Sequence, residues 1–212
     1  MARTVYFSFH YIDVIEFRVN VVRNSRDIHK IDDTSLFIDK SLWEEAAEKD
    51  FNSLRQIIDD GLKGCGVTVI LVGSETASRR WVKYEIIKSF TQGKGMLVVH
   101  INRIKTKSER KITKRGTNPL DRLRLYVDEN CEKVYFQELV NRKWVSFIDI
   151  PSVNNRKKNS RHFRKGNIFR KSEAGRAFKF SELFKMEYCW VQDNGYVNFT
   201  NWIEEAANEV DR

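Results

Sequence analysis

The chain has 212 residues and a formal net charge of +9; 41% of its residues are hydrophobic, and it contains only 2 prolines and 10 glycines. This length and composition are typical of one globular domain with its own core, and they exclude disordered, collagen-like and low-complexity proteins. No apolar run approaches the roughly 20 residues that span a bilayer, and no signal sequence opens the chain, so we expect a cytoplasmic protein without a membrane partner.

Strand-like and helix-like patterns alternate over the first hundred residues. The strand-like segments, rich in β-branched and aromatic residues, are 4–9, 35–39, 67–72 and 96–101. Apolar residues at helical spacing lie between them: after Asp13, which we expect to cap a helix ending near Asn24, from Phe51 to Leu62, and from Val82 to Phe90. This alternation indicates βαβ units on a parallel sheet, and therefore an α/β fold.

The alternation stops after Ile104 and resumes near residue 180. We interpret residues 105–180 as a basic insertion that contains a β-hairpin over 134–150 and a mobile arm. A last strand over 186–191 and a closing helix follow it. We therefore predict a single domain over residues 1–212, a doubly wound parallel sheet with the insertion before its last strand.

Positive charge is concentrated in this part of the chain, because residues 101–180 contain 22 Lys and Arg against 8 Asp and Glu. The charge peaks in two polar stretches, 105–115 and 156–171. Such runs usually form a solvated flank. The alternative is an anion-binding surface for nucleic acid or a nucleotide, on which Phe163 and Phe169 could stack.

Several common catalytic motifs are missing. No Gly-x-Gly-x-x-Gly follows the first strand, and the chain has no Gly-Lys-Ser/Thr phosphate loop and no Gly-x-Ser-x-Gly elbow. These absences exclude Rossmann dehydrogenases and P-loop NTPases and disfavour serine hydrolases. The three cysteines and four histidines stand in no ligand spacing, so we predict neither a disulfide framework nor a metal site.

In open α/β sheets, ligands bind beyond the carboxyl ends of the strands, here near 9–13, 39–43 and 73–78. In the helix that follows the third of these segments, Trp81 and Glu85 are four residues apart and share one face. We expect that face to be a flank where a cleft can form. On spacing alone, such a pair usually means an aromatic residue at the core edge and a solvated acid.

The motifs nevertheless resemble those of a known family. The opening strand VYFSFHY resembles the first signature of TIR domains, and VTVILVGSETASRRWVKYEI, from Val67 to Ile86, resembles the third-strand and helix signature of TIR-like proteins of bacterial antiphage systems. RVNVVRNS, from Arg18, and the ending NGYVNFTNWIEEA are similar to Thoeris ThsB proteins. The resemblance covers residues 3–104 and 182–208 well, and the insertion only loosely.

This resemblance implies a flavodoxin-like, five-stranded TIR fold and an enzyme that cleaves NAD at the nicotinamide-ribose bond, an NAD glycohydrolase or ADP-ribosyl cyclase. The product in such proteins is a cyclic ADP-ribose-type second messenger that activates an effector protein which senses it. The family's catalytic glutamate corresponds to Glu85. The resemblance also implies two kinds of partner. One is a phage component that triggers the enzyme, and the other is a second copy of the chain, bound through the loop at 39–50 in a homo-oligomer.

Cleavage of NAD suits a single carboxylate, because nicotinamide leaves as a neutral molecule and needs no general acid, unlike an ordinary glycoside. Glu85 would then stabilise the oxocarbenium-like state and hold the ribose hydroxyls. NAD is thus a substrate, and we expect no cofactor. The candidate substrate-binding residues beside Glu85 are Phe9, His10, Tyr11, Ser74, Ser78 and Trp81.

Two other functions remain open on the sequence. Many TIR and flavodoxin-like domains only bind partners, so a non-catalytic interaction module is one alternative. A nucleic-acid-binding TIR protein that uses the basic insertion is the other, and steep salt dependence of DNA or RNA binding would favour it.

Overall fold

The computed structural model describes residues 4–25, 32–33, 51–156 and 168–210. The strands are β1 (Thr4–Ser8), β2 (Asp32–Asp33), β3 (Val67–Val72), β4 (Gly95–His100), β5 (Leu123–Val127), β6 (Lys133–Val140), β7 (Lys143–Ser146), β8 (Ser152–Asn154), β9 (Ala177–Lys179) and β10 (Glu187–Cys189). The helices are α1 (Ile12–Ile15), α2 (Arg18–Arg23), α4 (Phe51–Leu62), α5 (Arg80–Thr91), α6 (Phe180–Leu183) and α7 (Gly195–Val210), with short 3-10 turns η2 (Thr76–Ser78), η3 (Pro119–Arg122) and η4 (Lys171–Glu173).

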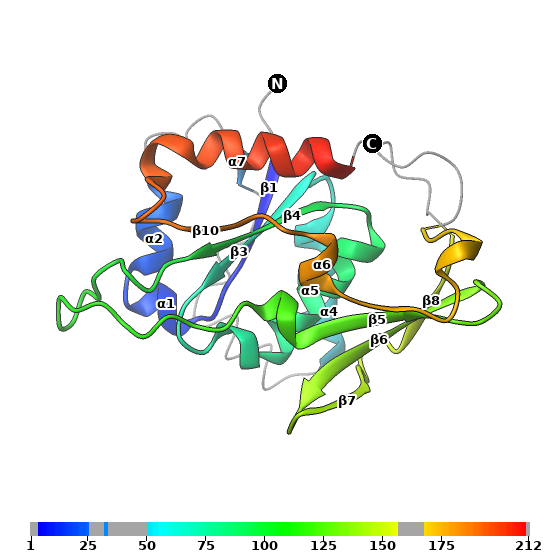
Figure 1. Ribbon diagram of the computed structural model, residues 1–212. Coiled ribbons are helices and arrows are strands. Elements are labelled where there is room, and N and C mark those ends of the chain that lie inside the picture. Colours follow the sequence, from blue (N-terminus) through cyan, green and yellow to red (C-terminus); the bar gives the residue numbers. More distant parts are fainter. Residues whose placement is uncertain (1–3, 26–31, 34–50, 157–167, 211–212) are drawn as a thin grey trace.

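One sheet is parallel and has the strand order β10-β4-β3-β1-β2 (Figure 1). Its central strands are β3 and β4, which are buried along their whole length. A strand that is apolar on both sides belongs inside such a sheet, because helices cover both faces. The carboxyl ends of β1, β3 and β4 lie along one edge, where the loops that start at residues 9, 73 and 101 begin.

Each face of this sheet supports its own core. On one face, side chains of β1, β3 and β4 pack against α4, α5 and the strands that follow residue 122. On the other face, the alternate side chains of the same strands pack against α2 and α7. Since successive side chains of a strand point to opposite faces, neighbouring residues of β1 belong to different cores.

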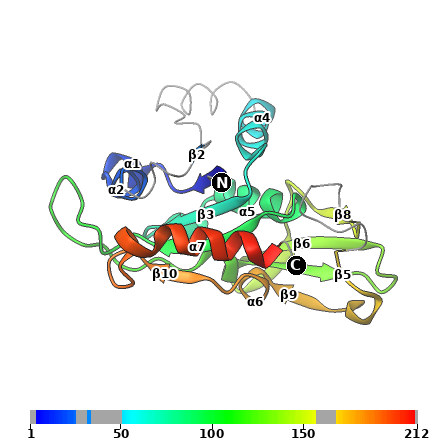
Figure 2. The same cartoon turned by 90° about the horizontal axis from the view of Figure 1, so that it is seen from above.

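A second, antiparallel sheet has the strand order β7-β6-β5-β9, and β8 pairs with β6. Figure 2 shows this sheet at one end of the molecule and α1 and α2 at the other. The turn between β6 and β7 consists of Asn141 and Arg142, both with positive φ. Leu125, Val127 and Phe136 of β5 and β6 are fully buried in the core that also contains α5. The second sheet therefore supports α5 from behind.

The expected α/β fold with a parallel sheet is confirmed, and so is the helix over 51–62. Gly64, with a φ of +79°, follows the end of that helix. The single helix that we predicted after Asp13 is wrong. Two short helices, α1 and α2, meet at Phe17, and no side chain caps α1. Asp13 is instead buried in an ion pair with Arg18, because two guanidinium nitrogens donate to its Oδ1 at 2.8 and 2.5 Å.

Some predictions lie outside the described residues: the strand over 35–39, the loop over 39–50 and most of the basic arm over 156–171. The other basic stretch, 105–115, is a loop that Figure 1 shows projecting past α1. Among the helices that the structure describes, none combines the length and the apolar character that a membrane crossing requires.

Candidate active site

Glu85 lies in the second turn of α5 and is only 6% exposed. Two donors from β1 hold its carboxylate: the Tyr6 hydroxyl donates to Oε1 at 2.6 Å, and the Ser8 hydroxyl donates to Oε2 at 2.5 Å. Tyr6 and Ser8 are two residues apart on a strand, so both point to the face that α5 covers. Each carboxylate oxygen thus has one donor in a fixed position.

Burial governs the charge of this group. It raises the pKa of Glu85 to about 7, although the hydrogen bonds from Ser8 and Tyr6 act in the opposite direction. Burial, together with the charge of Glu85, also raises the pKa of Tyr6 well above its usual value, so that the phenol remains a donor. Near neutral pH, Glu85 therefore exchanges readily between its protonated and ionised forms, as groups at functional sites often do.

Helix α5 is fixed to the parallel sheet next to Glu85. The Ser89 hydroxyl donates to the Glu85 carbonyl at 2.7 Å and lies 2.7 Å from the Thr68 hydroxyl of β3. Both hydroxyls are fully buried. This contact sets the height of the helix over the sheet, and with it the position of the carboxylate.

The same helix is bound to the second sheet by ion pairs. Lys83 Nζ lies 2.6 Å from Glu138 on β6. Asp149 follows β7, and its side chain is 2% exposed. It accepts from Arg80 at 2.7 and 2.5 Å and from Arg55 of α4 at 3.1 Å. A single buried carboxylate therefore joins α4, α5 and the second sheet.

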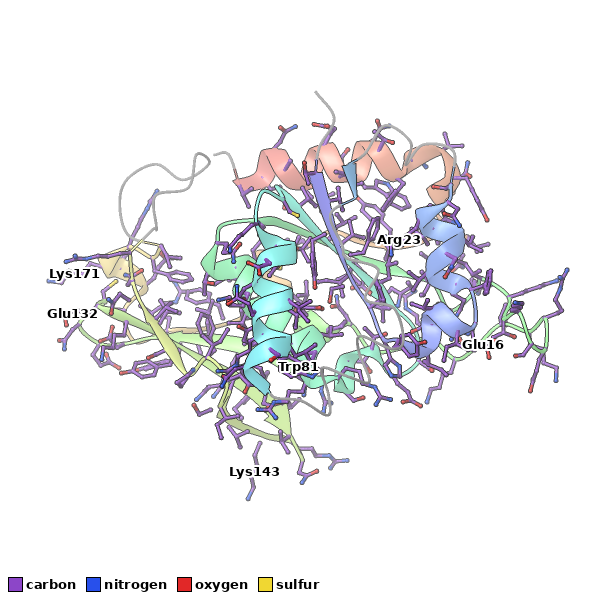
Figure 3. All side chains as sticks on the ribbon, turned by 180° about the vertical axis from the view of Figure 1, so that it is seen from behind. Glu16, Arg23, Trp81, Glu132, Lys143 and Lys171 are labelled. Atoms are coloured by element: carbon purple, nitrogen blue, oxygen red, sulfur yellow. The ribbon has the colours of Figure 1, made fainter. Side chains whose placement is uncertain are left out.

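Trp81 lies one turn before Glu85 and is partly buried against the core of this face. Its ring meets the Tyr84 ring edge-on, with 5.7 Å between the centroids, and the Arg80 guanidinium lies 5.9 Å from its centroid. Figure 3 views the molecule from the side of α4 and shows Trp81 beside one end of that helix. Trp81 thus places an aromatic ring near the carboxyl ends of the parallel strands.

The loop after β1 brings Phe9, His10 and Tyr11 to the same edge, each of them partly exposed. Burial, and secondly the nearby charge of Arg79, lower the pKa of His10 to about 4, so its imidazole is neutral at pH 7. A Cβ at Gly73, in the loop after β3, would lie 2.3 Å from a carboxylate oxygen of Asp13. The lack of a side chain at Gly73 therefore lets the loop after β3 approach α1 this closely.

The two predicted serines lie in the loop after β3 and are exposed. Ser78 ends η2 and precedes α5, so it does not share a helix face with Trp81. Its hydroxyl donates to the Glu75 carbonyl at 2.7 Å. Ser74 and Ser78 thus border the same edge of the sheet as the loop after β1, whereas Glu85 lies deeper.

The sequence reasoning placed Glu85 on an open flank, and this is wrong, because the carboxylate lies buried against β1. It also missed the two donors, Tyr6 and Ser8. The alternation of side chains along β1 could have indicated them. Tyr6 and Ser8 alternate with Val5 and Phe7, so their side chains must point to the other face of the sheet. A buried, oriented carboxylate of this kind can stabilise a positive charge that develops beside it.

The chain is similar to known proteins. Residues 6–106 match the family model described as Thoeris protein ThsB, TIR-like domain. A curated protein of Bacillus cereus (strain MSX-D12), named "Putative cyclic ADP-D-ribose synthase ThsB1", is 36% identical over 204 residues, which cover 96% of this chain and 100% of that protein. The match to this relative extends beyond residue 106 and thus includes the second sheet.

Proposed function

This chain belongs to the Thoeris ThsB family of TIR-like proteins, and from that premise we propose that it cleaves NAD at the bond between nicotinamide and ribose. We further propose that the product is a cyclic ADP-ribose-type second messenger. The name of the Bacillus cereus relative, a cyclic ADP-D-ribose synthase, supports this choice of product.

One observation carries the proposal: the carboxylate of Glu85 is buried and held by Tyr6 and Ser8 at 2.6 and 2.5 Å. An acid that only served solubility would lie in solvent. Burying one raises its pKa and costs stability, which a protein tolerates where the charge has a task. The same helix presents Trp81 one turn away.

In the proposed reaction, the bond between ribose C1′ and the nicotinamide nitrogen breaks, and its electron pair goes to nicotinamide. Nicotinamide leaves as a neutral molecule, so no general acid is needed. The ionised Glu85 carboxylate stabilises the oxocarbenium-like ribose that remains. A nucleophile of the same molecule then attacks C1′ and loses its proton, which closes a cyclic product; attack by water would give linear ADP-ribose.

The remaining candidate residues have supporting roles in this proposal. Trp81 stacks on the nicotinamide or its ribose, and Ser74 and Ser78 donate to hydroxyl or phosphate oxygens of NAD. The loop of Phe9, His10 and Tyr11 borders the substrate, and the neutral His10 adds no charge there. We propose no cofactor and no metal for this reaction.

The family also supplies a biological setting. Under this proposal the product activates a separate effector protein that senses it, and a phage component switches the enzyme on. Assembly into a homo-oligomer through the loop at 39–50, which lies outside the described residues, would complete the site.

The proposal is tested by incubating wild-type protein and the Glu85→Gln variant with NAD, with and without lysate of phage-infected cells. The small molecules are then resolved by mass. We expect a new species of cyclic ADP-ribose mass with the wild type only. Linear ADP-ribose alone would make the protein a hydrolase. Intact NAD under both conditions would contradict the proposed reaction and favour an interaction module.

A further inference from the structure

A pocket lies on the face of the parallel sheet opposite to Glu85, between α2 and the first turn of α7. Its volume is about 420 Å³, within the range of sites that hold small ligands. No residue of the proposed active site lines it. The lining residues are Phe17, Asn20, Val21, Asn24, Ser25 and Tyr196.

Phe17 forms one wall of this pocket in an unfavourable conformation. Its φ is 63°, in the left-handed region that bulky residues rarely occupy, and its side chain is 46% exposed. A strained backbone and an exposed aromatic ring both lower the stability of the fold. Because the ring is largely exposed, its burial offsets little of that loss. Strain of this kind tends to gather at functional sites, so a role for the ring outside the core is expected.

Two of the lining residues carry a polar side-chain atom that is buried and has no hydrogen-bond partner among the described residues. These atoms are Ser25 Oγ, in a residue that is 4% exposed, and Asn20 Oδ1. Buried polar groups nearly always have a partner, because an unpaired one loses the hydrogen bonds that water would give it. The hydroxyl and the amide therefore suit a ligand that itself carries donors and acceptors.

Tyr196 forms the opposite wall. It lies in the first turn of α7 and is 54% exposed, and its ring meets that of the buried Trp190 edge-on at 5.2 Å. Trp190 thus supports the tyrosine ring from behind. The pocket consequently has an aromatic ring on each of two elements that are far apart in sequence.

A cation lies against one of the lining residues, Phe17. Lys107 Nζ lies 4.3 Å from the centroid of the Phe17 ring, and the loop that carries it is held to α1 by hydrogen bonds from Ser108 to Glu16 at 2.9 and 3.1 Å. Figure 3 labels Glu16 on this side of the molecule, next to α1 and the projecting loop. A ligand seated against Phe17 would have this positive charge beside it.

We propose that this pocket binds the base of a nucleotide. A planar base carries donors and acceptors on its edge, which match the Asn20 amide and the Ser25 hydroxyl, and its faces stack on aromatic rings. The phosphate then lies near Lys107. The ligand is either a free nucleotide or an exposed end of a nucleic acid, which share this chemistry. The inference goes beyond NAD cleavage, because the pocket and Glu85 lie on opposite faces of the sheet.

Amide chemical-shift mapping tests the proposal, with ¹⁵N-labelled Glu85→Gln protein titrated with AMP, a single-stranded oligodeoxyadenylate or inorganic phosphate. We expect saturable shifts in residues 20–25 and at Tyr196. Binding of AMP assigns a free nucleotide, and binding of the oligonucleotide alone assigns a nucleic-acid end. Equal shifts with phosphate, or none with any of the three, would overturn the proposal.

Two exposed residues provide a matched pair of variants. Tyr196→Ala removes one wall of the pocket and should weaken AMP binding about tenfold, since base-aromatic stacking is lost. Val197→Ala changes the next residue, which is also exposed but does not line the pocket, and should leave binding unchanged. Equal losses in both would contradict the assignment. Because Glu85→Gln cannot turn NAD over under the proposed function, the outcome for the pocket is independent of the outcome for NAD cleavage.

Discussion

Strand β1 has two faces that serve different ends. Val5 and Phe7 point into a hydrophobic core, where the Phe7 ring stacks on that of Phe199 with 6.1 Å between the centroids. Tyr6 and Ser8 point to the other face and hold an ionisable acid, Glu85, away from water. The first face stabilises the fold by burying apolar area. The second face lowers stability, because the ionised Glu85 carboxylate is kept away from water. Neighbouring residues of one strand should therefore respond to substitution in different ways.

The apolar face gives the largest expected loss of stability. Phe7→Ala should lower the free energy of unfolding by about 3–5 kcal/mol, because it removes a buried ring and leaves a cavity. Urea unfolding followed by circular dichroism measures this. Tyr196→Ala, a truncated aromatic on the same side that is exposed, should stay within about 0.5 kcal/mol of wild type. A loss below 1 kcal/mol for Phe7→Ala would show that this core is not as well packed as described.

The face that holds Glu85 should make the free energy of unfolding depend on pH. The folded pKa of Glu85, about 7, lies above its unfolded value, so the folded state binds more protons between these values, and stability falls as pH rises through that window. Between pH 5 and pH 8 the loss of stability from this group is about 2–3 kcal/mol. Glu85→Gln should remove that part of the pH dependence.

The comparison is made by urea unfolding of wild type and Glu85→Gln at both pH values. Other titrating groups are common to the two proteins and cancel in the double difference. Parallel stability curves for the two proteins would show that Glu85 has an ordinary pKa, and the contrast between the two faces would then fail.

The contact between the sheets should have a smaller effect. Asp149→Asn weakens the bonds to Arg80 and Arg55. We expect a loss of about 1–2 kcal/mol, because hydrogen bonds to charged groups contribute to stability but the Arg80 side chain is 53% exposed, which weakens its pair. Burial would raise the pKa of Asp149, but the two guanidinium groups outweigh it and lower that pKa. Thermal unfolding measures the loss. Asp60→Asn, which disrupts an exposed pair with Lys63, is the control and should cost much less, because solvent screens such a pair; an equal loss would contradict a special role for Asp149.

Local patterns in the sequence predict much of the parallel sheet. The β-branched run of β3 and the apolar stripe of α4 need no distant partner to be recognised, and both lie where they were expected. Asp13 shows the limit of such reasoning. An aspartate before a helix is usually a cap, but here the approach of Gly73 and the position of Arg18 decide its role, and both depend on tertiary packing.

The second sheet was less predictable for the same reason. Strand β9 has only three residues, too few to show a periodic pattern. Its partner β5 is distant in the sequence, since Phe178 pairs with Leu125, so no local pattern indicates the pairing. At the candidate site, the family motif singled out Glu85, while the sequence alone could not show that it is buried. Its catalytic role, and those of Trp81, Ser74 and Ser78, stay predictions.

The dependence of NAD cleavage on pH tests the central claim most directly. If ionised Glu85 carries the reaction, kcat/KM of the wild type should rise with pH through a midpoint near 7. In Ser8→Ala the carboxylate loses a donor that favours its charged form, so the midpoint should move upward and the rate at pH 7 should fall. A rate that is flat from pH 5.5 to 8.5, or a midpoint that Ser8→Ala leaves unchanged, would contradict the account.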